Sequence, residues 1–133
     1  MYRGGSSADI NYHDTVMING LQFTCIIGML PEERISEQRV IINAELYTDF
    51  NQVSQSDSIA HTVNYAEAAD LLVAESKKCQ AEMVEFLGNH LINALKERFA
   101  DGLIGVTIEV LKPDILNNVD SVGIRMTRMF AND

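Results

Sequence analysis

The sequence predicts an α+β fold in which a four-stranded antiparallel sheet carries two helices on one face, in the order ββααββ. Two segments, residues 39–50 and 104–111, alternate apolar and polar side chains with the two-residue period of a β-strand. A segment that begins at Asn64 and residues 81–99 repeat apolar side chains every three or four positions, as amphipathic helices do. Each alternating segment has a second strand-like segment beside it in the sequence, which gives the four strands.

The first pair of strands comprises residues 16–27 and 39–50. Residues 16–27 are rich in Val, Ile, Leu, Phe and Thr, and Gly20 predicts a bend or bulge within them. Residues 29–38 contain Pro31 and four charged residues, so we expect a loop there. In the second strand one face carries the side chains suited to a core: Val40, Ile42, Ala44, Leu46 and Thr48.

The two helices follow a polar, serine-rich connection over residues 51–61. Asn64 is suited to cap the first helix, with Glu67 at the spacing of a capping box. Gly102 is a plausible stop for the second helix, which we expect over residues 81–99. The apolar positions are Tyr65, Ala68, Ala69, Leu72 and Val73 in the first helix and Val84, Leu87, Leu91 and Leu95 in the second.

The chain then returns to strands. Pro113 ends the strand of residues 104–111, because proline has no amide donor for the ladder. Residues 114–120 form a polar loop, and residues 121–129 alternate again as the last strand. A four-stranded sheet leaves two edges and one uncovered face, and such edges must be paired, covered or charged. We therefore expect several copies to assemble, closing their sheets into a barrel.

Composition limits the function classes. The 133 residues suit one domain, which we expect over residues 15–130 after a flexible leader over residues 1–14. A net charge of −9 opposes a nucleic-acid partner, which needs clustered Lys and Arg. No apolar run approaches the roughly 18 residues of a membrane span, so we expect no membrane partner. Cys25 and Cys79 form no CxxC pair and are expected to be reduced thiols in a reducing compartment.

Four residues stand where chemistry is conceivable, and each also has an ordinary interpretation. Lys112 ends a strand, where a partly desolvated lysine can act as a base, although most such lysines are simply solvated. Glu85 sits within an apolar helical stripe, where it could bind two donors of a ligand or reach water at the border. Tyr65 can relay a proton or pack at the helix start. Glu33 lies on a charged loop, and loops often carry function, although a charge cluster on a loop is usually just solvated.

Familiar motifs of other chemistries are missing from the sequence. The three histidines, His13, His61 and His90, have no metal-ligand spacing. There is no glycine-rich dinucleotide loop, no phosphate-binding loop and no serine-hydrolase elbow. Hydride transfer, nucleotide hydrolysis and serine acyl chemistry are therefore unsupported.

A series of short segments follows in a fixed order: Ile18-Asn19-Gly20-Leu21, Ile27-Gly28-Met29-Leu30-Pro31-Glu32-Glu33-Arg34, Gln38, Ser56-Asp57, Thr62-Val63-Asn64-Tyr65, Met83-Val84-Glu85, Leu111-Lys112-Pro113 and Ser121-Val122-Gly123-Ile124. Each segment is weak alone. Their joint order and spacing, over about residues 15–128, resemble the dihydroneopterin aldolase family.

The resemblance implies the tunnelling fold (T-fold), whose ββααββ units form a homo-oligomeric barrel, a tetramer or a stacked octamer, with active sites between subunits. It implies retro-aldol cleavage of a pterin substrate, 7,8-dihydroneopterin, into 6-hydroxymethyl-7,8-dihydropterin and glycolaldehyde. The intermediate of this reaction can also lead to epimerisation at the 2′ carbon. It further implies a place in folate synthesis and a cytoplasmic location. No metal, cofactor or Schiff base is implied.

By position, the resemblance also assigns roles to residues. Glu85 resembles the glutamate that anchors the 2-amino and ring N–H edge of the pterin, and Val84 adds backbone contacts beside it. Lys112 resembles the lysine that moves the proton, acting with a bound water. Tyr65, from a neighbouring subunit, resembles the tyrosine near the reacting side chain, and Glu33 the loop glutamate that approaches the site. The remaining residues expected in the pterin pocket are Thr62 and Val63.

Two alternatives stay open. The segment Asn117-Asn118-Val119-Asp120-Ser121-Val122 resembles the sister epimerases that act on dihydroneopterin triphosphate or dihydromonapterin. The first alternative is therefore a dedicated epimerase on the same fold. The second is a non-catalytic oligomeric protein that binds a pterin, which turnover by the purified protein would eliminate.

Overall fold

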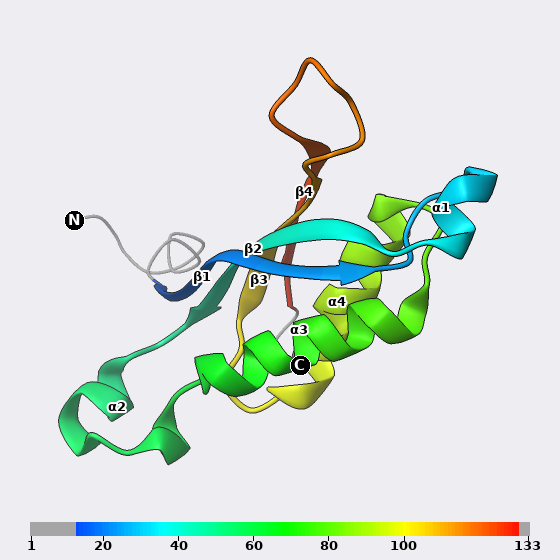
Figure 1. Ribbon diagram of the computed structural model, residues 1–133. Coiled ribbons are helices and arrows are strands. Elements are labelled where there is room, and N and C mark those ends of the chain that lie inside the picture. Colours follow the sequence, from blue (N-terminus) through cyan, green and yellow to red (C-terminus); the bar gives the residue numbers. More distant parts are fainter. Residues whose placement is uncertain (1–12, 131–133) are drawn as a thin grey trace.

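The fold is one antiparallel sheet with helices packed on one side (Figure 1). The computed structural model describes residues 13–130. The strands lie side by side in the order β1 (Asp14–Cys25), β2 (Gln38–Thr48), β3 (Gly105–Lys112) and β4 (Val122–Met129). The helix α3 (Tyr65–Cys79) packs against β1, and α4 (Val84–Arg98) packs against β3 and β4. The predicted α+β class and four-stranded antiparallel sheet are confirmed.

The core lies between the helices and the sheet. The predicted inward face of β2 is confirmed, because Val40, Ile42, Ala44, Leu46 and Thr48 are all buried. Opposite them lie the apolar faces of the two helices, with Leu72 of α3 and Leu87, Leu91, Ile92 and Leu95 of α4. Removal of this apolar surface from water is the main force that holds the helices on the sheet.

The bend predicted at Gly20 is confirmed. Gly20 has a φ of +71°, and the pairing of β1 with β2 shifts in register between Ile18 and Leu21. A positive φ costs glycine little, and an extra residue in one strand bends it and strengthens its twist.

The N-cap predicted for α3 is also confirmed. The Asn64 Oδ1 atom accepts hydrogen bonds from the amides of residues 66 and 67, at 3.0 and 3.2 Å. Glu67, expected to complete a capping box, forms an ion pair with Arg98 of α4. The cap fixes where α3 begins and therefore places Tyr65 at its first position.

Two predicted loops contain short helices, and there the prediction was wrong. Residues 29–38 include α1 (Pro31–Ile35). Residues 51–61 include α2 (Asn51–Ser56) and the 3₁₀ turn η2 (Ile59–His61). Pro31 stands at the start of α1, where its missing amide costs nothing. Such short helices are too brief to show a periodic apolar pattern, and helices of this length are unstable alone.

The face of the sheet turned away from the helices is polar at its centre. Asn43 Nδ2 donates to Glu109 Oε1 at 2.9 Å, and Arg125 Nε donates to Glu109 Oε2 at 2.7 Å. Both hydrogen bonds lower the pKa of Glu109, and the bond from Asn43 has the larger effect. A second hydrogen-bonded row on the same strands joins Tyr47, Thr107 and Thr127.

The two cysteines are free, as predicted. Burial raises the pKa of the Cys25 thiol to about 11, so this thiol is protonated at neutral pH. Of the predicted leader, residues 1–14, all but the last two residues lie outside the described part, and Asp14 is the first residue of β1. Within residues 13–130, none of the helices has the length and apolar character needed to cross a bilayer.

Candidate active site

Lys112 and Glu33 form a largely buried ion pair where β3 ends. Lys112 Nζ lies 2.7 Å from Glu33 Oε2, and the two side chains are 13% and 8% exposed. The strand ends there because Pro113 has no amide to continue the ladder. Two charges are costly to take out of water, and the cost is offset only where the geometry is good. A lysine that is largely removed from water and held by one carboxylate is therefore a candidate for a functional group.

Three donors hold the Glu33 carboxylate. Lys112 Nζ and Gln38 Nε2 both donate to Oε2, Gln38 at 2.9 Å, and the Leu30 amide donates to Oε1 at 3.2 Å. Burial alone would raise the pKa of Glu33, but these hydrogen bonds favour the charged form and the pKa is lowered. Gln38 also donates to the carbonyl of Ile27 at 2.7 Å, which fixes its amide. Sequence reasoning assigned Gln38 no role.

Two further residues shape the loop that carries Glu33, and the sequence alone assigned no role to either. Gly28 has a φ of +121°, and a Cβ atom there would lie 2.2 Å from Glu33 Cδ. Only glycine therefore lets the carboxylate come this close to the backbone. Arg34 donates to the carbonyl of Gly28 in its own loop. It also donates to the carbonyls of Gln80 and Ala81 in the turn between α3 and α4.

Val84 and Glu85 begin α4 at the same end of the molecule. The Gly28 amide donates to the carbonyl of Ala81 at 3.0 Å, three residues before Val84, so the Glu33 loop and the start of α4 are tied together. Glu85 is exposed in the first turn of α4, where the helix dipole favours an acidic side chain. Within one chain the Glu85 carboxylate reaches solvent, and its role toward a ligand stays a prediction.

Tyr65, Thr62 and Val63 lie at the opposite end. Tyr65 is the first residue of α3, whereas Gln80, which receives the Arg34 bond, follows the last. A helix of 15 residues is about 22 Å long at 1.5 Å per residue. Within one chain, Tyr65 therefore cannot reach the Lys112–Glu33 pair. The Tyr65 side chain is 68% exposed, which leaves it accessible to another chain.

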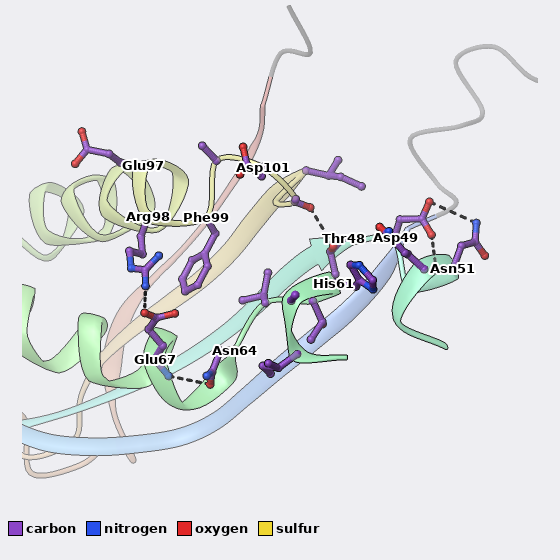
Figure 2. A pocket seen from close by; sticks show the side chains of 18 residues that line it. Thr48, Asp49, Asn51, His61, Asn64, Glu67, Glu97, Arg98, Phe99 and Asp101 are labelled. Carbon is purple, nitrogen blue, oxygen red and sulfur yellow. Dashed lines mark hydrogen bonds and ion pairs between the residues drawn. The ribbon is translucent and has the colours of Figure 1, made fainter. Parts of the chain in front are cut away.

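A cavity of about 830 Å³ lies at this second end (Figure 2). Thr62 and Val63 line it together with residues at the end of β2 and after α4, among them Thr48 and Gly102. Thr48 Oγ1 donates to the carbonyl of Gly102 at 3.0 Å and so joins two of its walls. The cavity does not include Lys112 or Glu33, so the predicted site residues form two separate groups in one chain.

The group around Lys112 offers specific chemistry. Its ammonium can exchange a proton with a ligand or a water, while the fixed carboxylate of Glu33 holds it in place. The exposed carboxylate of Glu85 can accept a pair of parallel N–H bonds from a planar ligand. This end of the chain can thus anchor a nitrogen heterocycle and move a proton.

A family model and curated relatives that resemble this chain all carry the same family name. The family model FolB, dihydroneopterin aldolase, matches residues 16–127. The dihydroneopterin aldolase of Bacillus subtilis (strain 168) is 30% identical over 124 residues, covering 86% of this chain and 97% of the relative. The enzyme of the same name from Escherichia coli (strain K12) is 26% identical over 115 residues, covering 86% of this chain and 93% of the relative.

Solved structures share the fold. The structure of E. coli dihydroneopterin aldolase in complex with neopterin superposes with a TM-score of 0.81 at 26% identity, covering 86% of this chain and 98% of that one. The dihydroneopterin aldolase of Burkholderia thailendensis, bound to guanine, superposes with a TM-score of 0.78 at 19% identity, covering 94% of this chain and 98% of that one. The second likeness is evidence for the fold alone.

Proposed function

Because the chain belongs to the dihydroneopterin aldolase family, we propose that it cleaves 7,8-dihydroneopterin into 6-hydroxymethyl-7,8-dihydropterin and glycolaldehyde, a lyase step of folate synthesis. The structural observation that supports this proposal is the ion pair between Lys112 and Glu33, whose charged atoms lie 2.7 Å apart. Lys112 stands where the family resemblance assigns the proton-handling lysine. The E. coli relative with bound neopterin supports a pterin as the ligand.

Glu85 anchors the pterin in this proposal. The 2-amino group and the neighbouring ring N–H of a pterin form a planar pair of donors, which suits a carboxylate as a bidentate partner. Glu85 is exposed in the first turn of α4, so its carboxylate is open to a ligand, and Val84 lies beside it. The backbone at Val84 supplies further contacts to the ring.

Lys112 handles the protons of the cleavage step. Removal of the proton from the 2′ hydroxyl turns C2′ into the carbonyl carbon of glycolaldehyde. The C1′–C2′ bond breaks, its electron pair moves into the imine of the dihydropterin ring, and C1′ is then protonated. Lys112 acts through a bound water, and Glu33 keeps its ammonium in position. The ring itself is the electron sink, so this mechanism calls on no metal or other cofactor.

Each site takes residues from two chains. Lys112, Glu33 and Glu85 come from one chain, and Tyr65 comes from another, with Thr62 and Val63 completing the pocket. The roughly 20 Å that α3 places between the two groups supports this arrangement. The edges of the sheet, β1 and β4, are available to pair with further strands. A ring of four chains, single or stacked in pairs, closes the sheets into a barrel.

A cytoplasmic location belongs to the same proposal. Both cysteines of the chain are free. Reducing compartments keep thiols in this form, whereas secreted domains of this size commonly carry disulfides.

The second candidate function is epimerisation at the 2′ carbon, on dihydroneopterin triphosphate or dihydromonapterin. The segment Asn117-Asn118-Val119-Asp120-Ser121-Val122 favours it. All of this segment except Val122, which begins β4, lies in the loop that projects beyond the sheet (Figure 1). The two reactions share one intermediate. If the glycolaldehyde fragment is released, the enzyme is an aldolase, and if it adds back to the other face, the enzyme is an epimerase.

Incubation of the purified protein with 7,8-dihydroneopterin, followed by chromatography of the products, tests the proposal. We expect 6-hydroxymethyl-7,8-dihydropterin and glycolaldehyde in equal amounts. An epimer without fragments would assign the protein to the second function. If the pterin binds and neither product forms, also with the triphosphate and with dihydromonapterin, the chain is a binding protein and the proposal is wrong.

A further inference from the structure

Arg34 joins the loop that carries Glu33 to the turn that leads into α4. Its Nη1 atom donates to the carbonyl of Gly28 at 3.0 Å and to the carbonyl of Ala81 at 3.2 Å. Its Nη2 atom donates to the carbonyl of Gln80 at 2.9 Å. One guanidinium group therefore bonds to two segments that are about 50 residues apart in the chain.

The turn between α3 and α4 is well suited to receive a cation. Gln80 has a φ of 48° and caps the C-terminal end of α3, so its carbonyl lies where the helix dipole is negative. Carbonyl groups at such an end have lost their partners in the helix and need donors from elsewhere. The planar fork of arginine can serve several of them at once, whereas the ammonium of lysine has no such fork.

The bonds of Arg34 lie between the two parts of the proposed site. On one side, Arg34 directly follows Glu33, the partner of Lys112. On the other side, Ala81 is four residues before Glu85, the proposed anchor of the pterin. The helix α1, which carries Glu33 and Arg34, has five residues and cannot keep its place by helix formation alone. Contacts of its side chains must therefore set its position.

We propose that Arg34 is a positioning residue, which sets the distance between the proton-handling pair Lys112–Glu33 and the pterin anchor Glu85. This inference rests on the proposed function. When the pterin ring is held by Glu85, the 2′ hydroxyl must reach Lys112, and a shift of about 1 Å between the two can cost a factor of about 100 in rate. Arg34 touches neither the ring nor the reacting atoms and acts through the two backbone segments that it joins.

The test uses Arg34→Lys, which keeps the charge, and Arg34→Met, which removes it. The matched control is Arg128→Met, because Arg128 also donates to a backbone carbonyl, that of its neighbour Thr127, but joins no distant segments. For each folded protein, kcat and KM with 7,8-dihydroneopterin, the affinity for a pterin without a side chain, and amide hydrogen exchange are measured. If Arg34→Met does not fold, Arg34→Lys alone carries the test.

We expect kcat to fall at least tenfold in Arg34→Lys and more in Arg34→Met, with the affinity for the bare pterin changed less than threefold. Hydrogen exchange is expected to rise both in residues 28–35 and in residues 80–85, and the control is expected to match the parent. A purely structural role would lower Tm and leave kcat unchanged, and that result would overturn the proposal.

The failure of the proposed function gives a different result. If the parent protein does not cleave dihydroneopterin, the aldolase proposal is wrong, and hydrogen exchange still tests the role of Arg34. Increased exchange in both segments would then support the positioning role. Increased exchange in residues 28–35 alone, with residues 80–85 as in the parent, would refute it.

Discussion

The ammonium of Lys112 lies 2.7 Å from the carboxylate of Glu33, although 79 residues separate the two in the chain. One ends a central strand and the other lies on the short helix α1, so the contact joins the sheet to a loop at its edge. Gln38 and the Leu30 amide complete the environment of the carboxylate. Loss of either charged partner leaves a buried charge without compensation, and this makes the pair sensitive to substitution and to pH.

The Glu85→Ala variant is expected to lose pterin binding with little change in Tm. Two charge-assisted hydrogen bonds are lost, each worth about 1.5–3 kcal/mol, while the exposed side chain contributes little to the fold. Calorimetric titration with neopterin measures the affinity. Glu82→Ala, an exposed acid in the turn before α4, is the control and should bind as the parent does. Unchanged affinity in Glu85→Ala would remove Glu85 from the pocket.

Glu33 is expected to make stability depend on pH in the acid range. Because its pKa in the folded state is lowered, the carboxylate stabilises the fold above its ordinary pKa of 4.5, and this contribution is lost as the pH falls through the folded value. Urea unfolding of the parent and of Glu33→Gln, from about pH 6 to about pH 3, should show a difference in unfolding free energy that narrows on acidification.

The remaining acid dependence serves as the internal control for that experiment. The pKa values of Glu75 and Glu109 are also lowered by hydrogen bonds to their neighbours, and both residues are intact in the variant. Both proteins should therefore still lose stability at low pH. Two parallel curves, with a constant difference, would show that the charge of Glu33 does not stabilise the fold.

Gly28→Ala is expected to destabilise the protein and to slow turnover. The φ of +121° is strained for alanine, and the new Cβ would overlap the Glu33 carboxylate. A loss of about 1–3 kcal/mol in unfolding free energy is expected from urea titration. Gly102→Ala, where a Cβ meets nothing within 4 Å, is the control and should stay within about 0.5 kcal/mol of the parent. Equal stability of the two variants would contradict the close approach.

Two inactive variants are expected to restore activity in a mixture. Lys112→Ala and Tyr65→Ala each damage every site of their own oligomer. In a randomly mixed oligomer, about a quarter of the sites combine an intact Lys112 from one chain with an intact Tyr65 from another, so activity should return to about a quarter of the parent value. The variants are unfolded together, refolded and assayed with dihydroneopterin.

Two measurements secure the interpretation of the mixture. Native mass spectrometry shows whether mixed oligomers form, and the two variants refolded separately and then combined give the background. If mixed oligomers form and activity stays at this background, Lys112 and Tyr65 do not serve one site from two chains.

The regular elements could be predicted because their patterns are local and long. The alternation of Val40, Ile42, Ala44 and Leu46 reflects a strand with one face on the core, and the structure buries all four. The cap at Asn64 needs only two amides in the next turn of chain. The helix α1 was missed because it has one turn and depends on contacts with distant residues.

The candidate site was less accessible to sequence reasoning. Lys112 and Glu33 could be named, but their mutual contact spans 79 residues and follows no periodic pattern. The bonds of Arg34 to Gln80 and Ala81 also span 46 and 47 residues of sequence. Gly28 was visible as a glycine, while the reason for it, the carboxylate beside its Cα, exists only in three dimensions.

The polar rows on the uncovered face of the sheet bear on the order of folding and association. Glu109 accepts hydrogen bonds there from Asn43 and Arg125, so these polar groups have partners while the face is exposed to water. The apolar core is complete between the sheet and the helices of one chain. A newly made copy can therefore form its own core before it meets its partners, and what association then has to cover is the two strand edges and scattered exposed side chains such as Met17 and Phe86.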